Sequence, residues 1–225
     1  MSNKKAPEKM RFAAIAVDVV TFSIVDGKLS VLLGMINRLP HYKNAEAFIG
    51  GLIEMPETAE VALERHLKSK TKLKNIFWEQ LYTFSDINRD ERNRVVSVSY
   101  LGLVNPDESK QSLIEGLRWC PISKLPKLAF DHNRMFKVAL DRLKGKLSYT
   151  NIAQYLLPKK FTLTELQTVY ELVLEKEIDK RNFRKKIISL DIVVETGEMK
   201  QGMKNRPAAL YRFNTEKLIE LAPIV

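Results

Sequence analysis

Apolar and polar positions alternate in two ways along this chain, and each way predicts its own kind of element. In the first half, residues 17–24 and 29–35 are short apolar runs separated by the pair Asp26-Gly27. An Asp-Gly pair tolerates the left-handed conformation that a two-residue turn requires. We therefore expect these two runs to form an antiparallel hairpin.

The second half shows helical spacing instead. Residues 133–144 carry an apolar stripe and are followed by Gly145, so we expect a helix that ends there. A shorter helix over residues 150–156, stopped by Pro158, is expected to follow. This organisation predicts an N-terminal domain over residues 1–145, a linker helix over residues 146–158 and a second domain over residues 159–225.

The second domain has the pattern of a helix-turn-helix followed by a β-hairpin. Thr162 and Glu165 have the spacing of a capping box, and apolar residues then recur at helical intervals. Asp179 is placed to cap a second helix over residues 180–190. Segments 192–196 and 208–213 are expected to be strands that flank a polar, basic loop, which together would form a wing.

Basic residues gather on the second helix and on the wing. The helix face opposite the apolar positions carries Arg181, Asn182, Arg184 and Lys185, Lys180 begins the helix, and the wing contains Lys200, Lys204 and Arg206. An Arg fork matches guanine, an Asn amide matches adenine, and Lys binds phosphate. The pattern therefore favours double-stranded DNA as the partner, with the second helix in the major groove. The alternative is a solvated basic face without a partner.

The composition agrees with that interpretation. The 225 residues include 37 Lys and Arg against 27 Asp and Glu, and the net charge of +10 suits a polyanionic partner. No apolar run approaches the roughly 20 residues of a membrane span, and the start of the chain does not have the pattern of a signal peptide. The single cysteine, Cys120, excludes an internal disulfide, and we expect a cytoplasmic location.

Residues 51–73 have the spacing of a known hydrolytic motif without most of its chemistry. The positions of the Nudix box are kept at Gly51, Glu57, Arg65, Leu67 and Leu73. Box carboxylates and a glycine are replaced by His66, Ser69, Lys70 and Lys72. Positions 66 and 70 share one helix face, and neither an imidazole nor an ammonium is the oxygen ligand that Mg²⁺ prefers. We therefore expect no hydrolysis, no catalytic residue, no metal ligand and no cofactor.

Together these segments resemble the Nudix-related transcriptional regulators, the NrtR-like family, from about residue 15 to residue 213. The resemblance rests on the box, on segments 48–51, 81–86 and 94–104, and on segments 161–167, 179–184 and 206–213. It implies an α+β fold, with an N-terminal Nudix-like α/β/α sandwich built on a mixed sheet and a C-terminal winged helix-turn-helix. It also implies a homodimeric repressor of NAD-metabolism genes that binds a palindromic operator. By the same resemblance, the Nudix domain senses ADP-ribose or a related nucleotide, commonly releasing DNA when the ligand binds.

The candidate ligand-binding residues follow from their chemistry. Gly50 and Gly51 lead toward a helix expected to start near Pro56, whose backbone N–H groups favour an anion. Lys70 is expected to place its ammonium where a catalytic metal would sit. The other candidates are Phe48 and Tyr82 for stacking on adenine, Arg38, Arg89, Arg92 and Arg94 for diphosphate or ribose oxygens, and Glu57. Each has a structural alternative: Phe48 in the core, Glu57 paired with Arg65, and the cations solvated.

Two other functions stay open at this stage. Glu79, Asp86, Asp90 and Glu91 could rebuild a metal site outside the box, which would make the chain a weak nucleoside-diphosphate hydrolase with an added domain. Alternatively, the Nudix domain is purely structural and only dimerises a DNA-binding protein. Turnover of ADP-ribose with Mg²⁺ or Mn²⁺ identifies the first, and a lack of nucleotide binding identifies the second.

Overall fold

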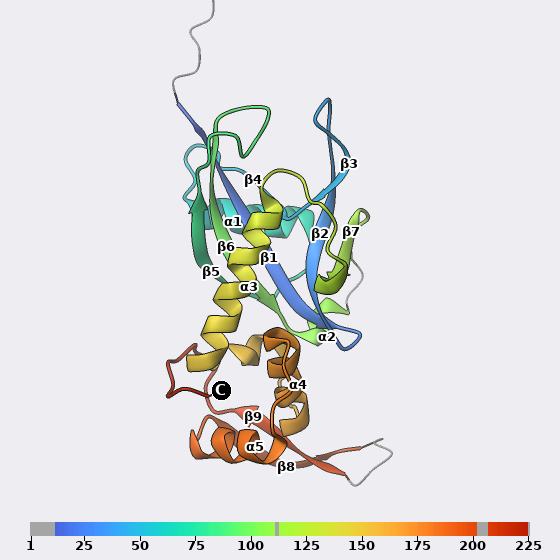
Figure 1. Cartoon of the computed structure of the whole chain (residues 1–225), viewed down its shortest axis with the longest axis vertical. Helices are drawn as coiled ribbons and strands as arrows, with labels where there is room; N and C mark the ends of the chain where they lie inside the picture. Colours follow the sequence, from blue (N-terminus) through green and yellow to red (C-terminus); the bar gives the residue numbers. More distant parts are fainter. Residues whose placement is uncertain (1–11, 111–112, 202–206, 225) are drawn as a thin grey trace, which may run out of the picture.

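A seven-stranded mixed sheet forms the N-terminal part of the molecule (Figure 1). The computed structural model describes residues 12–110, 113–201 and 207–224. The strand order is β3-β2-β1-β6-β5, with β4 paired to β1 and β7 paired to β2. Strands β1 and β6 are parallel, and β1 is antiparallel to β2 and β4. The strands are β1 (Ala14–Val25), β2 (Lys28–Arg38), β3 (Tyr42–Ala47), β4 (Ile49–Leu52), β5 (Ile76–Phe84), β6 (Val95–Val104) and β7 (Leu117–Pro121).

The first two strands form the hairpin that the Asp-Gly pair predicted. Asp26 and Gly27 have φ values of 48° and 71°, and Val25 pairs with Lys28 across the turn. Both central residues are therefore in the left-handed region, as a two-residue turn between twisted strands requires. The sequence pattern did not indicate β3, β7 or the short helix α2 (Pro106–Ser109).

Two helices cover opposite faces of the sheet, α1 (Ala59–Lys70) and α3 (His132–Tyr149). Val17 and Val19 of β1 belong to the buried cluster that contains Leu63 of α1. Val20 and Phe22 belong instead to the cluster that contains α3 residues. Because successive strand side chains point to opposite faces, this division confirms the α/β/α sandwich.

Helix α3 is longer than the sequence pattern predicted. It continues through Gly145 to Tyr149, because Leu143 and Leu147 extend its apolar stripe and are fully buried. The 3₁₀ helix η2 (Ile152–Leu156) follows, and its Ile152 is also fully buried. The segment expected to be a linker is therefore part of a core that extends into both parts of the molecule. The residue limits of the two domains stay a prediction.

The C-terminal part is a winged helix. The capping box at Thr162 is present: the Glu165 N–H donates to Thr162 Oγ1 (3.2 Å), and the Thr162 N–H donates to Glu165 Oε2 (2.8 Å). The Asp179 side chain accepts from the Asn182 N–H (2.8 Å), as an N-cap does. The elements are α4 (Leu163–Leu174), α5 (Lys180–Ser189), β8 (Val193–Lys200) and β9 (Ala208–Phe213).

Figure 1 shows α3 in yellow, running from the sheet to the winged helix. At the end of α3 that reaches the winged helix, Lys144 Nζ lies 3.1 Å from Oε1 of Glu175, which follows α4. Phe77 of β5 stacks on Tyr155 of η2, with ring centroids 4.0 Å apart. Among the described residues, no helix is long and apolar enough to cross a membrane.

Candidate DNA-binding surface and nucleotide site

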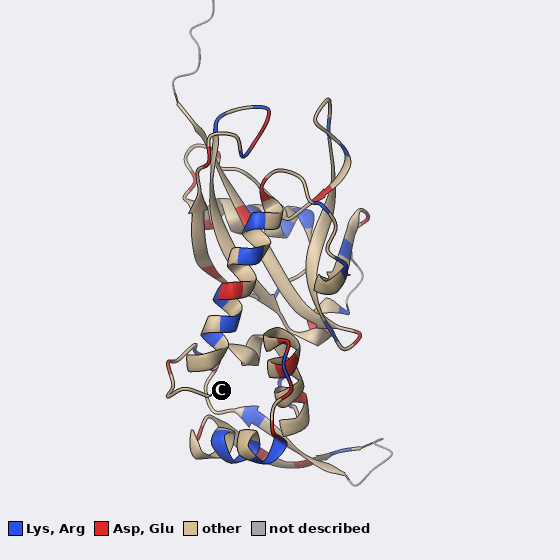
Figure 2. Ribbon diagram, in the orientation of Figure 1, with Lys and Arg blue, Asp and Glu red and all other residues tan. Residues whose placement is uncertain are grey.

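Helix α5 presents a basic face because two of its apolar residues, Phe183 and Ile187, turn inward, whereas Ile188 is 57% exposed. Phe183 and Ile187 are buried, and the Phe183 ring lies 5.1 Å from that of Tyr170 on α4. The opposite face exposes Lys180, Arg181, Asn182 and Lys185. Figure 2 shows these basic positions at the end of the molecule farthest from the sheet. The sequence pattern therefore identified an accessible set of hydrogen-bond donors.

Two of the predicted DNA-contacting residues are used inside the domain instead. Arg184 is half-buried, and its Nη2 donates to Thr164 Oγ1 on α4 (2.9 Å). Lys200 Nζ lies 2.5 Å from Glu165 Oε1. Each residue thus has a partner in its own domain, and its contact with DNA stays a prediction. Lys204 and Arg206 lie outside the described residues.

The box face of α1 is fixed by hydrogen bonds. His66 is buried, its Nε2 lies 3.0 Å from the Leu52 carbonyl, and burial lowers the pKa of its imidazole. Lys70 Nζ donates to the Gly50 carbonyl. Partial desolvation lowers the pKa of Lys70, although the Asp18 carboxylate opposes the change. Neither side chain supplies the oxygen ligands that Mg²⁺ prefers, and the described residues contain no cluster of three His, Cys, Asp or Glu side chains suited to a metal.

The helix ends without the left-handed residue that the box glycine would supply. Thr71 caps α1 with a φ of −134°, and both its N–H and its Oγ1 donate to the Leu67 carbonyl. Lys72, which stands at the glycine position, is exposed. A threonine hydroxyl thus satisfies the end of the helix in place of a glycine turn.

Gly50 and Gly51 are closely packed. Both lie in β4, and α1 begins at Ala59 rather than near Pro56, so the two glycines do not lead directly into the helix, and their contact with an anion stays a prediction. A Cβ on Gly50 would lie 2.2 Å from the Val17 carbonyl, and a Cβ on Gly51 would lie 2.4 Å from the His66 ring. Only glycine allows strand β4 to approach β1 and α1 this closely.

Glu57 belongs to the scaffold of the segment that precedes α1. Its two oxygens accept from Arg65 Nε (2.5 Å) and Nη2 (2.8 Å), and the hydrogen bonds from Arg65 lower the pKa of Glu57 to about 2. The Glu54 N–H also donates to this carboxylate (2.9 Å). These contacts favour the alternative of a helix-scaffolding ion pair for Glu57, and its contact with the ligand stays a prediction.

Phe48 and Arg89 are both buried, which favours structural roles for them, and their contact with the ligand stays a prediction. The Phe48 ring stacks on His132 with centroids 5.3 Å apart, and the Phe48 N–H donates to His132 Nδ1 (3.0 Å). Burial lowers the pKa of His132 to about 3, so the ring is neutral. The Arg89 guanidinium donates to Asp131 through Nη2 (2.8 Å) and Nε (3.2 Å).

A buried polar centre that the sequence pattern missed lies beside these residues. Asp18 accepts from Ser97 Oγ (2.6 Å) and lies 3.6 Å from Arg89 Nη2 and 3.7 Å from His132 Nε2. Burial raises the pKa of Asp18 to about 6, against the Ser97 hydrogen bond and the Arg89 charge. The available signal was a lone carboxylate inside the apolar run of β1.

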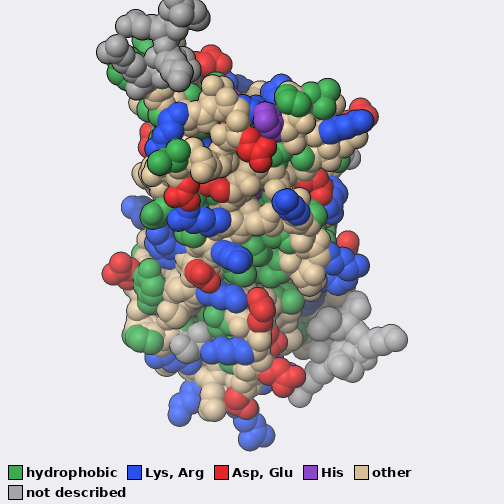
Figure 3. Space-filling model, turned by 45° about the horizontal axis from the view of Figure 1, so that its top comes forward, with side chains coloured by type: hydrophobic (Ala, Val, Ile, Leu, Met, Phe, Trp, Pro, Cys, Tyr) green, Lys and Arg blue, Asp and Glu red, His purple; other side chains and the backbone are tan. Residues whose placement is uncertain are grey.

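The exposed candidates lie at one end of the sheet. Tyr82, Ser99, Asp18 and Gly50 are paired in turn across β5, β6, β1 and β4, so they form one row across the sheet. Tyr82 at one end of this row is 51% exposed, and Lys70 binds the glycine at the other end. Arg38, Arg92 and Arg94 are also exposed, but Arg92 pairs with Asp90 (2.7 Å) and Arg94 donates to the Asp86 carbonyl (3.0 Å). Figure 3 shows basic, acidic and apolar side chains interspersed at this end.

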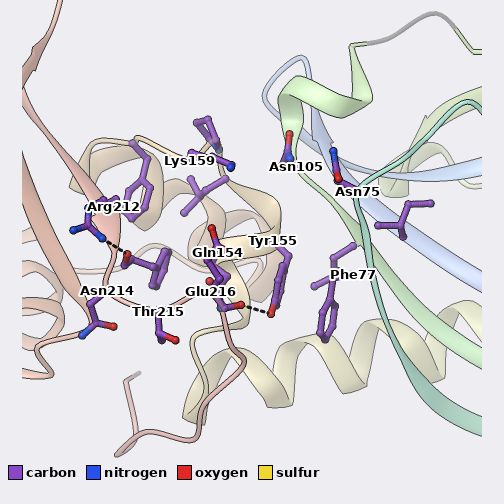
Figure 4. A pocket seen from close by; sticks show the side chains of 16 residues that line it. Asn75, Phe77, Asn105, Gln154, Tyr155, Lys159, Arg212, Asn214, Thr215 and Glu216 are labelled. Atoms are coloured by element: carbon purple, nitrogen blue, oxygen red, sulfur yellow. Dashed lines mark hydrogen bonds between the residues drawn. The ribbon is translucent and has the colours of Figure 1, made fainter.

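A separate cleft of about 580 Å³ lies between the sheet and the winged helix (Figure 4). Phe77 and Tyr155 form its aromatic wall, and Tyr155 Oη donates to the Glu216 carbonyl (3.1 Å). None of the predicted ligand-binding residues lines this cleft. It is therefore distinct from the end of the sheet that carries Tyr82 and Lys70.

Comparisons with known proteins agree with this architecture. The NUDIX domain model matches residues 14–139, and the model of the NrtR DNA-binding winged helix domain matches residues 153–213. The "ADPR responsive transcriptional repressor NtrR" of Acinetobacter baylyi is 34% identical over 205 residues, covering 88% of this chain and 81% of that protein. An "ADP-ribose pyrophosphatase" of Methanocaldococcus jannaschii is 31% identical over 130 residues, covering 55% of this chain and 71% of that protein.

A solved structure extends the likeness to the whole molecule. Shewanella oneidensis NrtR in complex with a 27mer DNA has a TM-score of 0.78 and 31% identity, covering 89% of this chain and 93% of that one. The Nudix sandwich, the winged helix and their order along the chain are thus shared with proteins of one family. The chain belongs to the NrtR family of Nudix-related transcriptional regulators.

Proposed function

We propose that this protein is a homodimeric repressor of NAD-metabolism genes, and that its Nudix domain binds ADP-ribose or a related nucleotide without hydrolysing it. Binding of the ligand releases the protein from its operator. The observation that carries this proposal is the similarity, along 88% of the chain, to a relative whose name describes an ADPR-responsive repressor.

DNA recognition is proposed for the exposed face of α5. Arg181 offers a forked pair of donors to a guanine edge and Asn182 an amide to adenine, while Lys180 and Lys185 are placed for phosphates. A two-fold dimer would present two such helices to the two halves of a palindromic site. Phosphate contacts give affinity and register, and the Arg and Asn contacts give sequence preference.

For the ligand, we propose that Lys70 replaces the metal that a Nudix hydrolase uses. Its ammonium is held at the Gly50 carbonyl, and the Arg38 charge is close enough to lower the pKa of Lys70 further. Two neighbouring cations neutralise a diphosphate without activating water, because they bring no metal-bound hydroxide. The exposed ring of Tyr82 is proposed to stack on a base at the other end of the row.

The hydrolase alternative is favoured by the similarity to the Methanocaldococcus pyrophosphatase, but the four carboxylates proposed for it are occupied. Glu79 lies 3.0 Å from Lys146 Nζ, Asp90 2.7 Å from Arg92 Nη2, and Glu91 3.0 Å from His41 Nδ1. Asp86 pairs with Arg134. These side chains bind four different partners, so they support structural roles over a shared metal site.

The test compares binding and turnover of ADP-ribose. Isothermal titration calorimetry with Lys70→Glu should show affinity at least ~10-fold weaker than wild type, because charge reversal replaces attraction with repulsion near the diphosphate. The exposed neighbour Lys72→Glu is the matched control and should change affinity by less than ~3-fold. Unchanged affinity in Lys70→Glu would refute the role of Lys70. Release of AMP by the wild type with Mg²⁺ or Mn²⁺ would favour the hydrolase.

A further inference from the structure

Three basic residues of the winged helix are bound within the domain, and they meet at the start of α4. Arg184 of α5 donates to Thr164 Oγ1 (2.9 Å). Lys200, at the end of β8, lies 2.5 Å from Glu165 Oε1. Lys160 Nζ, just before α4, lies 2.5 Å from Glu198 Oε1 on β8. The first contact joins α5 to α4, and the other two join the wing to the same region.

Glu165 holds two of these elements at once. Its Oε2 accepts from the N–H (2.8 Å) and the Oγ1 (3.0 Å) of Thr162, which completes the capping box. Its Oε1 remains for Lys200 (2.5 Å). Because the box already fixes the carboxylate, only the lysine loses rotamer freedom when the ion pair forms.

The outer half of β8 pairs with β9 at Met199 and Lys200 and reaches the start of α4 through two ion pairs. At the base of the wing, Phe161 and Tyr211 exchange two backbone hydrogen bonds of 3.0 and 2.7 Å. Farther out, the register of β8 with β9 shifts between Glu195 and Met199. Glu198 and Lys200 lie two positions apart in the strand, so both point to the side that faces the start of α4. The two ion pairs therefore connect Glu198 and Lys200, in the outer half of β8, to the start of α4.

We propose that Glu165 and Lys200 are positioning residues that set the wing against DNA, and that Lys200 does not contact phosphate. The proposal rests on the proposed DNA-binding function and deepens it. It divides the basic residues into Lys180, Arg181 and Lys185, which meet DNA, and Lys200, which shapes the surface. The sequence alone suggests the opposite role for Lys200, because it is a lysine on a wing.

The variant Glu165→Gln separates positioning from simple charge. Gln keeps the capping box at this position but cannot form the ion pair. Removing a negative charge from a DNA-binding domain would by itself strengthen binding to a polyanion. Positioning predicts the reverse: operator affinity in fluorescence anisotropy should fall roughly 2- to 5-fold, the range that an exposed ion pair allows. Lys200→Met should weaken binding by a similar factor.

Two further measurements distinguish positioning of the wing from a purely electrostatic effect on DNA affinity. In Lys200→Met, the slope of log affinity against log salt concentration should match that of the wild type, whereas loss of a phosphate contact would reduce it by about 0.9. The double variant should bind no more weakly than either single variant, because both remove the same pair. The matched control is Lys43→Met, which replaces an exposed lysine of β3 in the N-terminal part. It should change neither the operator affinity nor the salt slope.

The outcomes are distinguishable. A fall in affinity with Glu165→Gln, together with an unchanged salt slope in Lys200→Met, supports the proposal. Tighter binding by Glu165→Gln, a reduced slope in Lys200→Met, or additive losses in the double variant would overturn it. Wild-type protein that binds operator and scrambled DNA equally would overturn the proposed function itself, before any variant is compared.

Discussion

Replacing Asp18 by Asn should stabilise the protein at neutral pH, and the gain should depend on pH. Asp18 is 8% exposed, and burial raises its pKa from 3.8 to about 6. The groups that face it are Ser97 of β6, Arg89 before β6, His66 and Lys70 of α1, and His132 of α3. Asn keeps a hydrogen-bond acceptor for Ser97 but has no charge to desolvate.

The size of the effect follows from the pKa. At about 1.4 kcal/mol per pKa unit, the rise from 3.8 to about 6 amounts to about 3 kcal/mol. Because the folded-state pKa lies above the unfolded value, the folded protein holds this proton more tightly than the unfolded chain does. The contribution of Asp18 to stability is therefore fully present below pH 3.8 and is lost as the pH rises through about 6.

Urea unfolding, followed by circular dichroism between pH 4 and pH 8, measures how the contribution of Asp18 to stability depends on pH. The free energy of unfolding of Asp18→Asn, relative to wild type, should increase by about 2 kcal/mol from pH 4 to pH 8, because pH 4 already lies just above the unfolded pKa. Burial lowers the pKa of His132 to about 3, so its ring in the folded protein stays neutral over this range. The control is Asp26→Asn, the same substitution in an exposed turn whose φ of 48° suits Asn. A difference that is flat, or that shrinks with rising pH, would show that Arg89 and Lys70 stabilise an ionised Asp18.

Other substitutions test the fold and the DNA-binding face. Gly51→Ala places a Cβ 2.4 Å from the His66 ring and should destabilise the protein in thermal unfolding by about 1–3 kcal/mol. Gly145→Ala, within α3 and with nothing within 4 Å, should instead be neutral or stabilise by up to about 1 kcal/mol, and equal effects would contradict the packing argument. Lys185→Met should weaken binding to all DNA sequences and reduce the salt slope by about 0.9 in anisotropy titrations. An unchanged salt slope would show that Lys185 does not contact phosphate.

Local signals predicted the first hairpin of the sheet and the two helices α4 and α5 of the winged helix. The Asp26-Gly27 turn, the Thr162 capping box and the Asp179 cap each depend on residues within a few positions, and all three are present. The apolar spacing of residues 180–190 also identified the exposed face of α5. Gly145 misled the prediction of where α3 ends, because burial of Leu147 outweighs the low helix propensity of one glycine.

The surroundings of the candidate ligand-binding residues depend on contacts that no local pattern reveals. Phe48 is placed by His132, which lies 84 positions later in the chain, and Arg89 by Asp131, 42 positions later. Arg184 lies next to the exposed face of α5, yet it binds Thr164, 20 positions earlier. Whether an aromatic or basic side chain is free or bound is decided by these distant partners, and therefore by the tertiary fold.

The most direct test of the proposed sensor-repressor is fluorescence anisotropy on DNA from upstream of the protein's own gene and of NAD-metabolism genes. The titration is run at physiological salt with scrambled DNA as control, and ADP-ribose is then added. We predict tight binding to the specific DNA that ADP-ribose reverses. Specific binding that ADP-ribose leaves unchanged would contradict the sensor, and equal binding to scrambled DNA would contradict the repressor.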